Sequence, residues 1–117
     1  MQSRRQIFAL LLVLLGHAKT MAQTPPIARV SVLADGKLLL NGELVTLSAL
    51  SAALKKLKEA NGVVWYYREN GQGEPTPQAM SAIKLVVEHS LPVSMSSKAD
   101  FSDYIDATGN SKPRQKQ

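Results

Sequence analysis

Residues 30–47 read VSVLADGKLLLNGELVTL, and this stretch decides the fold. Its first part alternates apolar with small polar side chains, as a strand with one buried face does. An Asp-Gly pair at 35–36 then predicts a tight hairpin turn, and three leucines at 38–40 form the returning strand. The sequence therefore predicts that the fold opens with a β-hairpin, made of strands at 28–33 and 38–40.

A helix follows this hairpin. An Asn-Gly pair at 41–42 turns the chain again, and Thr46 has the hydroxyl that caps the N-terminus of many helices. From there to about Ala60, lysines and Glu59 occupy one helical face, and an Asn-Gly pair at 61–62 ends the helix. The opposite face is an apolar stripe made of Leu47, Leu50, Leu54 and Leu57.

The rest of the chain predicts a strand, a second helix and a last strand. The sequence VVWYYR at 63–68 is dense in β-branched and aromatic residues, which favour strands. Thr76 followed by Pro77 predicts the start of a helix that runs to about His89, because proline fits the first helical position. Alternation at 91–96 predicts the last strand. The side chains expected to face inward from the second helix are Met80, Ile83, Val86 and Val87.

These elements predict an α+β fold. Their order is ββαβαβ, and two amphipathic helices can cover only one face of one sheet. We therefore expect a two-layer sandwich with both helices on one face of a small mixed sheet. Pro92 suits the start of a strand or an edge of the sheet.

Residues 1–22 are predicted to be a cleavable export signal peptide. Two arginines precede a nine-residue apolar run at 7–15, and small residues at 20 and 22 suit a cleavage site after Ala22. Cleavage after Ala18 and retention as an anchor are the alternatives, although a membrane-spanning helix needs about 20 apolar residues. The expected location is the periplasm, with no stable membrane insertion after cleavage.

The positive charge of the chain is concentrated at its two ends. Lysine and arginine together number 14 against 9 aspartates and glutamates, yet residues 28–106 are close to neutral. We expect residues 23–27 to be a linker, 28–106 the domain and 107–117 a disordered basic tail, with irregular structure already beyond Lys98. A near-neutral domain does not favour nucleic acid as a partner. The tail either contacts anionic lipid or is simply solvated.

No arrangement of residues predicts catalysis, a metal site or a cofactor. The lack of cysteine excludes disulfides, zinc–thiolate sites and a cysteine nucleophile. Asp100, Asp103 and Asp106 recur every three residues, a spacing that does not match a calcium loop. The remaining enzymatic alternative is a small hydrolase that uses His89 with Asp100 or Asp103, and nothing adjacent in the sequence supports such a triad.

The motifs in residues 30–47 resemble the opening of the periplasmic domain of the ExbD/TolR family. That domain shows a strand, an Asp-Gly turn, a second strand, Asn-Gly-x-x-Val and a Leu-rich helix, and the resemblance extends over about residues 28–97. It implies the family fold and a binding habit, since these periplasmic domains dimerise and contact partner proteins or cell wall. Family members also carry a membrane helix with an essential carboxylate in energy-coupling complexes of the inner membrane. The apolar run here is too short and holds no Asp or Glu, so the resemblance does not carry over proton-motive coupling.

The aromatic strand at 63–68 is the candidate binding site. Its alternation separates Trp65 and Tyr67 from Val64 and Tyr66, and the family pattern puts the latter pair against the helices. Trp65 and Tyr67 would then lie on the open face of the sheet, bordered by the loop at 69–75. The opposite register, with Trp65 in the core, is the alternative. The predicted protein-binding residues are Arg29, Trp65, Tyr67, Arg68 and Glu69.

The sequence therefore predicts an exported, non-enzymatic protein-binding domain that acts through its open sheet face. The expected partner is another periplasmic or envelope protein, and a homodimer is a further expectation from the resemblance. The alternative function is a periplasmic inhibitor or immunity-type protein that binds and neutralises a toxic hydrolase.

Overall fold

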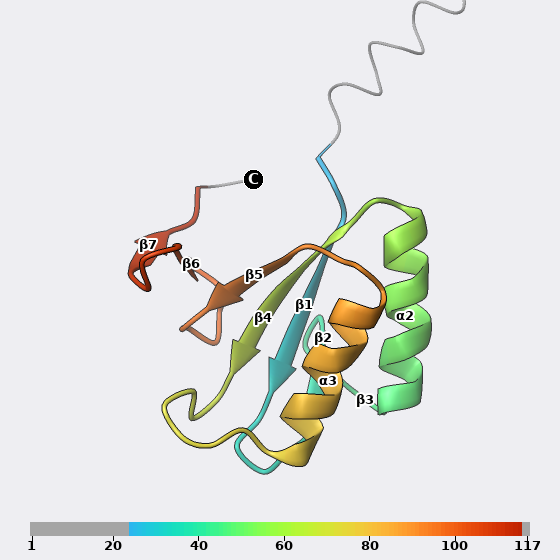
Figure 1. Cartoon of the computed structure of the whole chain (residues 1–117), viewed down its shortest axis with the longest axis horizontal. Helices are drawn as coiled ribbons and strands as arrows, with labels where there is room; N and C mark the ends of the chain where they lie inside the picture. Colours follow the sequence, from blue (N-terminus) through green and yellow to red (C-terminus); the bar gives the residue numbers. More distant parts are fainter. Residues whose placement is uncertain (1–23, 116–117) are drawn as a thin grey trace, which may run out of the picture.

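Five strands form one mixed sheet with two helices on one of its faces, within residues 24–115, which the computed structural model describes (Figure 1). The predicted signal peptide, residues 1–22, lies outside the described residues. Among residues 24–115, no helix has both the length and the apolar character needed to cross a membrane. The elements are β1 (Ile27–Val32), β2 (Leu38–Leu40), β3 (Glu43–Val45), α2 (Leu47–Glu59), β4 (Val63–Arg68), α3 (Pro77–Glu88), β5 (Val93–Ser96), β6 (Asp103–Ile105) and β7 (Ser111–Pro113).

The strands of the main sheet lie in the order β3-β2-β1-β4-β5, and β6 pairs with β7 in a separate two-stranded sheet. β1 runs antiparallel to β2 and parallel to β4, which in turn runs parallel to β5. The predicted α+β sandwich with a mixed sheet is confirmed, and β5 is an edge strand, as Pro92 indicated. The structure adds β3, a three-residue strand whose side chains are largely exposed and which therefore has no burial pattern that a sequence could reveal.

Both helices begin at the predicted caps. The hydroxyl of Thr46 accepts a hydrogen bond from the backbone N–H of Ala49, and Thr76 accepts one from Ala79, at 3.0 and 3.1 Å. At the end of α2 the chain needs glycine, because a Cβ at Gly62 would lie 2.8 Å from the backbone carbonyl oxygen of Pro26. This close passage lets β4 start directly beside β1.

The core lies between the helices and the sheet. Val64 and Tyr66 of β4 face the helices, so the register predicted for the aromatic strand is confirmed. Leu50 and Leu54 of α2 are fully buried against the sheet, and the burial of each contributes about 1.5–3 kcal/mol. The core is completed by Val30, Val32, Leu38, Ala79, Ala82, Val86 and Leu91.

The inward face of α3 differs from the prediction. Ala79, Ala82 and Val86 face the sheet, whereas Met80 and Val87 are exposed. The small alanine side chains let α3 pack close to the sheet, and this contact turns the larger apolar stripe outward. The sequence could not show this rotation, because both stripes have the same helical period.

The C-terminal region also differs from the prediction. Residues 107–115 are not a disordered tail: β6 and β7 pair as a hairpin that follows β5, with Tyr104 opposite Lys112 (Figure 1). We call residues 97–115 the C-terminal arm. It has little apolar periodicity because polar groups and one phenylalanine hold it in place, and this is why its sequence resembles a solvated tail.

Candidate functional site

The aromatic face of the sheet is present but not open. Trp65 lies on the side opposite the helices, as predicted, yet only 9% of its surface is exposed, because the C-terminal arm covers it. The guanidinium of Arg114 stacks 3.9 Å from the centre of the Trp65 ring, and that of Arg29 lies 4.9 Å away. Both distances are in the range of cation–π contacts. The prediction of an open face is therefore corrected.

Phe101 is the apolar wedge of the arm. Its ring centre lies 6.5 Å from that of Trp65 and 6.2 Å from that of Tyr67, which it meets edge-on. Its backbone has a φ of +59°, a left-handed conformation that is costly for a bulky residue. Arg114 helps to hold this conformation, because its Nε donates a hydrogen bond to the Phe101 carbonyl at 3.1 Å. The packing of the arm thus imposes a strained turn.

Asp103 joins the arm to the end of β5. Its buried carboxylate accepts hydrogen bonds from the hydroxyls of Ser96, Ser97 and Ser111 at 2.6, 2.5 and 2.6 Å. It also accepts one from the backbone N–H of Ser97 at 3.0 Å. Burial alone would raise the pKa of Asp103, but these hydrogen bonds outweigh it and hold the pKa well below the usual value. The carboxylate is therefore charged and acts as an anchor.

Arg68 and Glu69 have structural tasks in the loop that follows β4. The guanidinium of Arg68 donates to the carbonyls of Gly71 and Gly73 at 3.0 and 3.1 Å. The carboxylate of Glu69 accepts a hydrogen bond from the backbone N–H of Ala34 at 2.7 Å, which ties this loop to the β1–β2 turn. Of the predicted residues, the structure brings Arg29, Trp65 and Tyr67 to one face, while Arg68 and Glu69 organise the loop at its border.

The structure does not bring together the residues of the hydrolase alternative. Nε2 of His89 is buried without a hydrogen-bond partner among the described residues, and the oxygens of Asp103 are engaged by serines. The carboxylates of Asp100 and Asp106 accept backbone N–H groups of their own turns. Within residues 24–115 no group of three or more His, Cys, Asp or Glu side chains could hold a metal ion.

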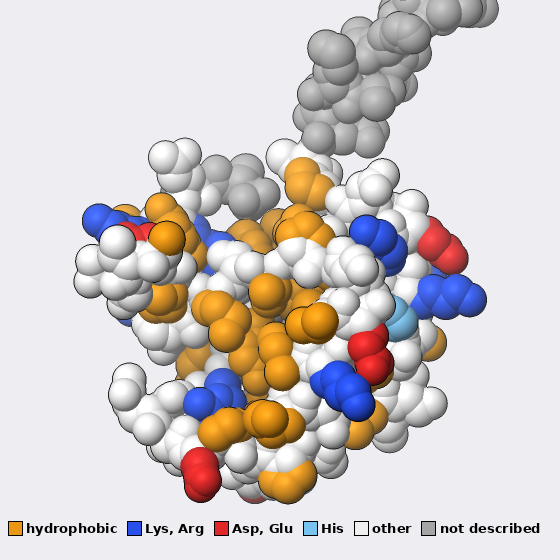
Figure 2. Space-filling model, in the orientation of Figure 1, with side chains coloured by type: hydrophobic (Ala, Val, Ile, Leu, Met, Phe, Trp, Pro, Cys, Tyr) orange, Lys and Arg blue, Asp and Glu red, His pale blue; other side chains and the backbone are white. Residues whose placement is uncertain are grey.

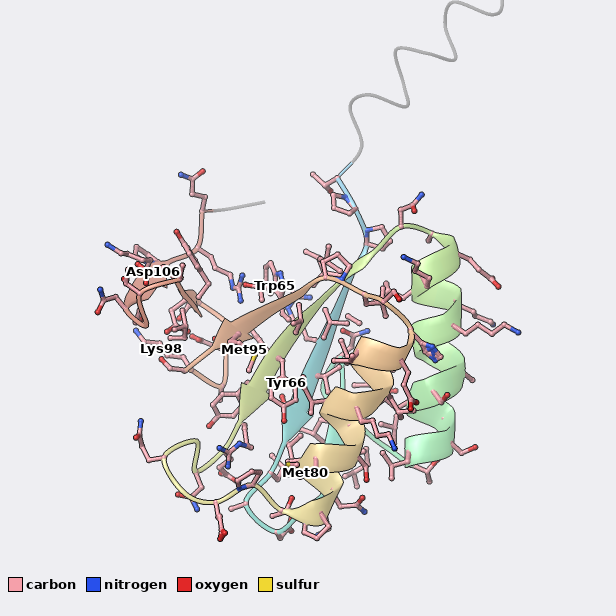
Figure 3. All side chains as sticks on the ribbon, in the orientation of Figure 1. Trp65, Tyr66, Met80, Met95, Lys98 and Asp106 are labelled. Carbon is pink, nitrogen blue, oxygen red and sulfur yellow. The ribbon has the colours of Figure 1, made fainter. Side chains whose placement is uncertain are left out.

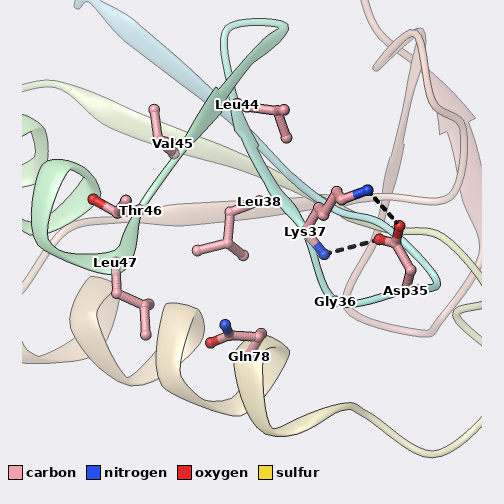
Figure 4. A pocket seen from close by; sticks show the side chains of 9 residues that line it. All are labelled: Asp35, Gly36, Lys37, Leu38, Leu44, Val45, Thr46, Leu47 and Gln78. Atoms are coloured by element: carbon pink, nitrogen blue, oxygen red, sulfur yellow. Dashed lines mark hydrogen bonds and ion pairs between the residues drawn. The ribbon is translucent and has the colours of Figure 1, made fainter.

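A hollow of about 390 Å³ lies between the β2–β3 hairpin and the first turns of both helices (Figure 4). Its two charged residues, Asp35 and Lys37, pair with each other at 3.2 Å. Leu38, Leu44 and Leu47 provide much of the remaining lining. The hollow therefore offers no unpaired charge and no nucleophile.

A further set of exposed apolar side chains lies on α3 and β5. The stripe that α3 turns outward lies next to the edge strand β5, whose side chains at Val93 and Met95 point to the same side of the sheet. Figure 2 shows hydrophobic side chains gathered over these two elements. We call this the α3–β5 surface; its members Met80, Val87, Val93 and Met95 are 41–67% exposed, and Ile83 is half-buried.

The α3–β5 surface exists because two helices do not cover five strands. Each helix is about 10 Å wide and each strand takes about 4.8 Å, so the helix layer ends near β4 and leaves β5 uncovered. In addition, β5 has hydrogen-bonded neighbours on one side only. The sequence signal was present in Met80 and Val87, but both side chains were predicted to face the core.

The chain matches no protein-family model and no curated protein sequence.

Proposed function

We propose that this chain is an exported, non-enzymatic protein-binding domain whose binding surface is the α3–β5 surface. The observation that supports the proposal is a contiguous apolar surface beside an unpaired strand edge. Natural proteins usually protect sheet edges with charges, prolines or covering elements. Here β6 of the C-terminal arm contacts β5 but does not pair with its backbone. From Val93 to Ser96 this edge has no charged side chain, and clusters of exposed apolar groups of this kind mark interaction sites.

The proposed partner is an extended segment of another periplasmic or envelope protein that pairs with β5. Such a segment would satisfy the free backbone groups of β5 by hydrogen bonds, and its alternate side chains would pack between the edge strand and α3. Val93 and Met95 from the strand and Met80 from the helix would be the apolar contacts. This mode needs no catalytic group and no cofactor.

The resemblance to the ExbD/TolR periplasmic domain supports a role in the bacterial envelope. The order of strands and helices along the chain is consistent with the order on which the resemblance rests, and the proposal extends the resemblance to the binding habit of the family. The sequence predicted binding through the open sheet face that carries Trp65. Because the C-terminal arm covers that face, we assign binding to the α3–β5 surface instead.

A Met95→Lys variant tests the proposal. A lysine in the middle of the apolar surface is expected to weaken capture of the partner about tenfold or more, because a charge would be buried without a counter-ion. The mature chain would serve as bait in periplasmic extract, with crosslinking and quantitative mass spectrometry. Leu44→Lys is the matched control, since Leu44 is also an exposed apolar residue of an edge strand, at the opposite side of the sheet.

The outcomes separate the functions. A partner lost with Met95→Lys and kept with Leu44→Lys supports the α3–β5 surface, and an envelope protein as that partner supports the proposed role. A hydrolase that the chain inhibits would instead support the inhibitor or immunity alternative. Self-association that Met95→Lys abolishes in sedimentation would identify a homodimer. Equal capture by all three baits would show that this surface is not the binding site.

A further inference from the structure

A second cleft lies where the parallel strands β4 and β5 end. It occupies about 440 Å³ between the loop after β4 and the C-terminal arm. The residues that line it include Tyr66, Arg68, Gln72, Met95, Ser97 and Ile105. Figure 3 shows Tyr66 and Met95 on the side of the molecule that faces the viewer. In open sheets, ligands commonly bind beyond the carboxyl ends of parallel strands.

Tyr66 has an unused hydrogen-bond donor in this cleft. The residue is only 5% exposed, yet its hydroxyl makes no hydrogen bond within residues 24–115, and the side chain lines the cleft. Burial raises the pKa of Tyr66, while the charge of Arg68 opposes this rise. The hydroxyl is therefore protonated at neutral pH and can donate. The hydroxyl is not among the fully enclosed side-chain atoms that lack a partner, so its donor remains accessible.

The cleft also has one uncompensated positive charge. No carboxylate of the described residues forms an ion pair with Arg68, whose guanidinium donates only to backbone carbonyls. Among the described residues, no aspartate or glutamate lines the cleft. Met95 and Ile105 add apolar surface beside these donors. The lining thus combines a single positive charge, a hydroxyl donor and an apolar wall.

We propose that this cleft is a binding site for a carboxylate that carries an apolar group. The Tyr66 hydroxyl donates to a carboxylate oxygen, the charge of Arg68 favours the anion, and Met95 and Ile105 contact the apolar part. A single guanidinium matches a monoanion better than a phosphate dianion. A free organic acid and the C-terminal carboxylate of a protein chain share this chemistry. The cleft shares Met95 with the α3–β5 surface, so its tests vary Tyr66 and Gln72, which are not members of that surface.

Titration of the ¹⁵N-labelled mature chain followed by NMR tests the site. The probes are hexanoate and acetyl-Ala-Leu-Val as its free acid, each compared with the corresponding amide. Both acids are expected to shift the amide signals of residues 66–72 and 95–97, and the uncharged amides are not. Tighter binding of hexanoate would point to a free acid, and tighter binding of the peptide acid to a chain terminus. Absence of shifts by both acids at about 10 mM would overturn the proposal.

Two substitutions locate the binding. Tyr66→Phe removes the hydroxyl and keeps the ring, and it is expected to weaken hexanoate binding about tenfold, the effect of one hydrogen bond to a charged group. Tyr104→Phe, on the arm, is the control and is expected to change nothing. Unchanged affinity in a folded Tyr66→Phe variant would contradict the site.

A second pair of variants changes the charge of the cleft without altering the hydrophobic core of the protein. Gln72→Glu is expected to weaken hexanoate binding about two- to fivefold and Gln72→Lys to strengthen it by a similar factor, as for exposed charge pairs. Gln78→Glu, on α3 and outside this cleft, is the matched control. Equal affinity of both Gln72 variants would overturn the proposal even if Tyr66→Phe did not fold.

Discussion

Replacing Trp65 by alanine is expected to lower the free energy of unfolding by about 3–5 kcal/mol, the usual cost of removing a buried tryptophan. The indole is the surface on which the C-terminal arm rests, through Arg114 and Phe101. Its removal leaves a cavity beneath the arm and ends the cation–π contacts of Arg114 and Arg29. The arm should then detach, although the core between helices and sheet stays intact.

Urea denaturation followed by far-UV circular dichroism measures this change, since Trp65 is the only tryptophan and the variant has no indole fluorescence. Tyr104→Ala is the matched control, because Tyr104 is an aromatic residue of the same arm that is 36% exposed and lies 5.9 Å from the Arg114 guanidinium, against 3.9 Å for Trp65. It should change stability by less than about 1 kcal/mol. A loss below about 1 kcal/mol for Trp65→Ala would show that the arm is not docked on the indole in solution.

Replacing Asp103 by asparagine is expected to lower the free energy of unfolding by about 2–3 kcal/mol. The amide has nearly the same shape, but its nitrogen cannot accept, so hydroxyls of Ser96, Ser97 or Ser111 lose their acceptor. The arm loses its anchor to β5, and Trp65 becomes accessible to acrylamide, which quenches its fluorescence. Asp106→Asn is the control, as Asp106 accepts hydrogen bonds only within its own turn. Equal quenching of Trp65 in both variants would contradict the anchoring role.

Asp103 also makes stability depend on pH. Because the folded protein holds the pKa of Asp103 below that of the unfolded chain, near 3.9, the unfolded state binds more protons in acid. The stabilisation is therefore complete above about pH 5 and decreases as the pH falls towards the folded-state pKa. Hydrogen bonds in their own turns also lower the pKa values of Asp35, Asp100 and Asp106, with the same sign.

The comparison with Asp103→Asn isolates the contribution of Asp103, since the other three aspartates are present in both proteins. Between about pH 4 and pH 2, the free energy of unfolding should fall more steeply for the wild-type chain than for the variant. Chemical denaturation at a series of pH values provides the two slopes. Parallel curves would mean that Asp103 titrates in the folded protein as it does in the unfolded chain.

Local chemistry made several elements predictable. Thr46 and Thr76 cap their helices because their hydroxyls reach N–H groups three residues on, a relation that lies within one turn. The alternation around Val64 and Trp65 correctly divided the aromatic strand into two faces, because a strand has a side-chain period of two.

The candidate sites were less predictable. Trp65 was placed on the correct face of the sheet. The sequence could not show that the C-terminal arm covers it, because Arg114 lies 49 positions further along the chain and approaches Trp65 only in the folded state. Met80 and Val87 were expected in the core, because nothing in their spacing shows how many strands the helices must cover. The Tyr66 cleft joins residues from β4, β5 and the arm and has no sequence motif.

The sequence by itself determined the order of β1, β2, α2, β4, α3 and β5, the turns at its Asn-Gly and Asp-Gly pairs, and the two faces of β4, because each depends on neighbours within a few positions. Only the tertiary structure decided which face of α3 is buried, that β3 and β5 form the two edges of the sheet and that the arm covers Trp65. The physical reason is the distance along the chain over which each effect acts. Backbone conformation and helix capping depend on residues a few positions apart. Burial depends on the area left uncovered once all elements have packed.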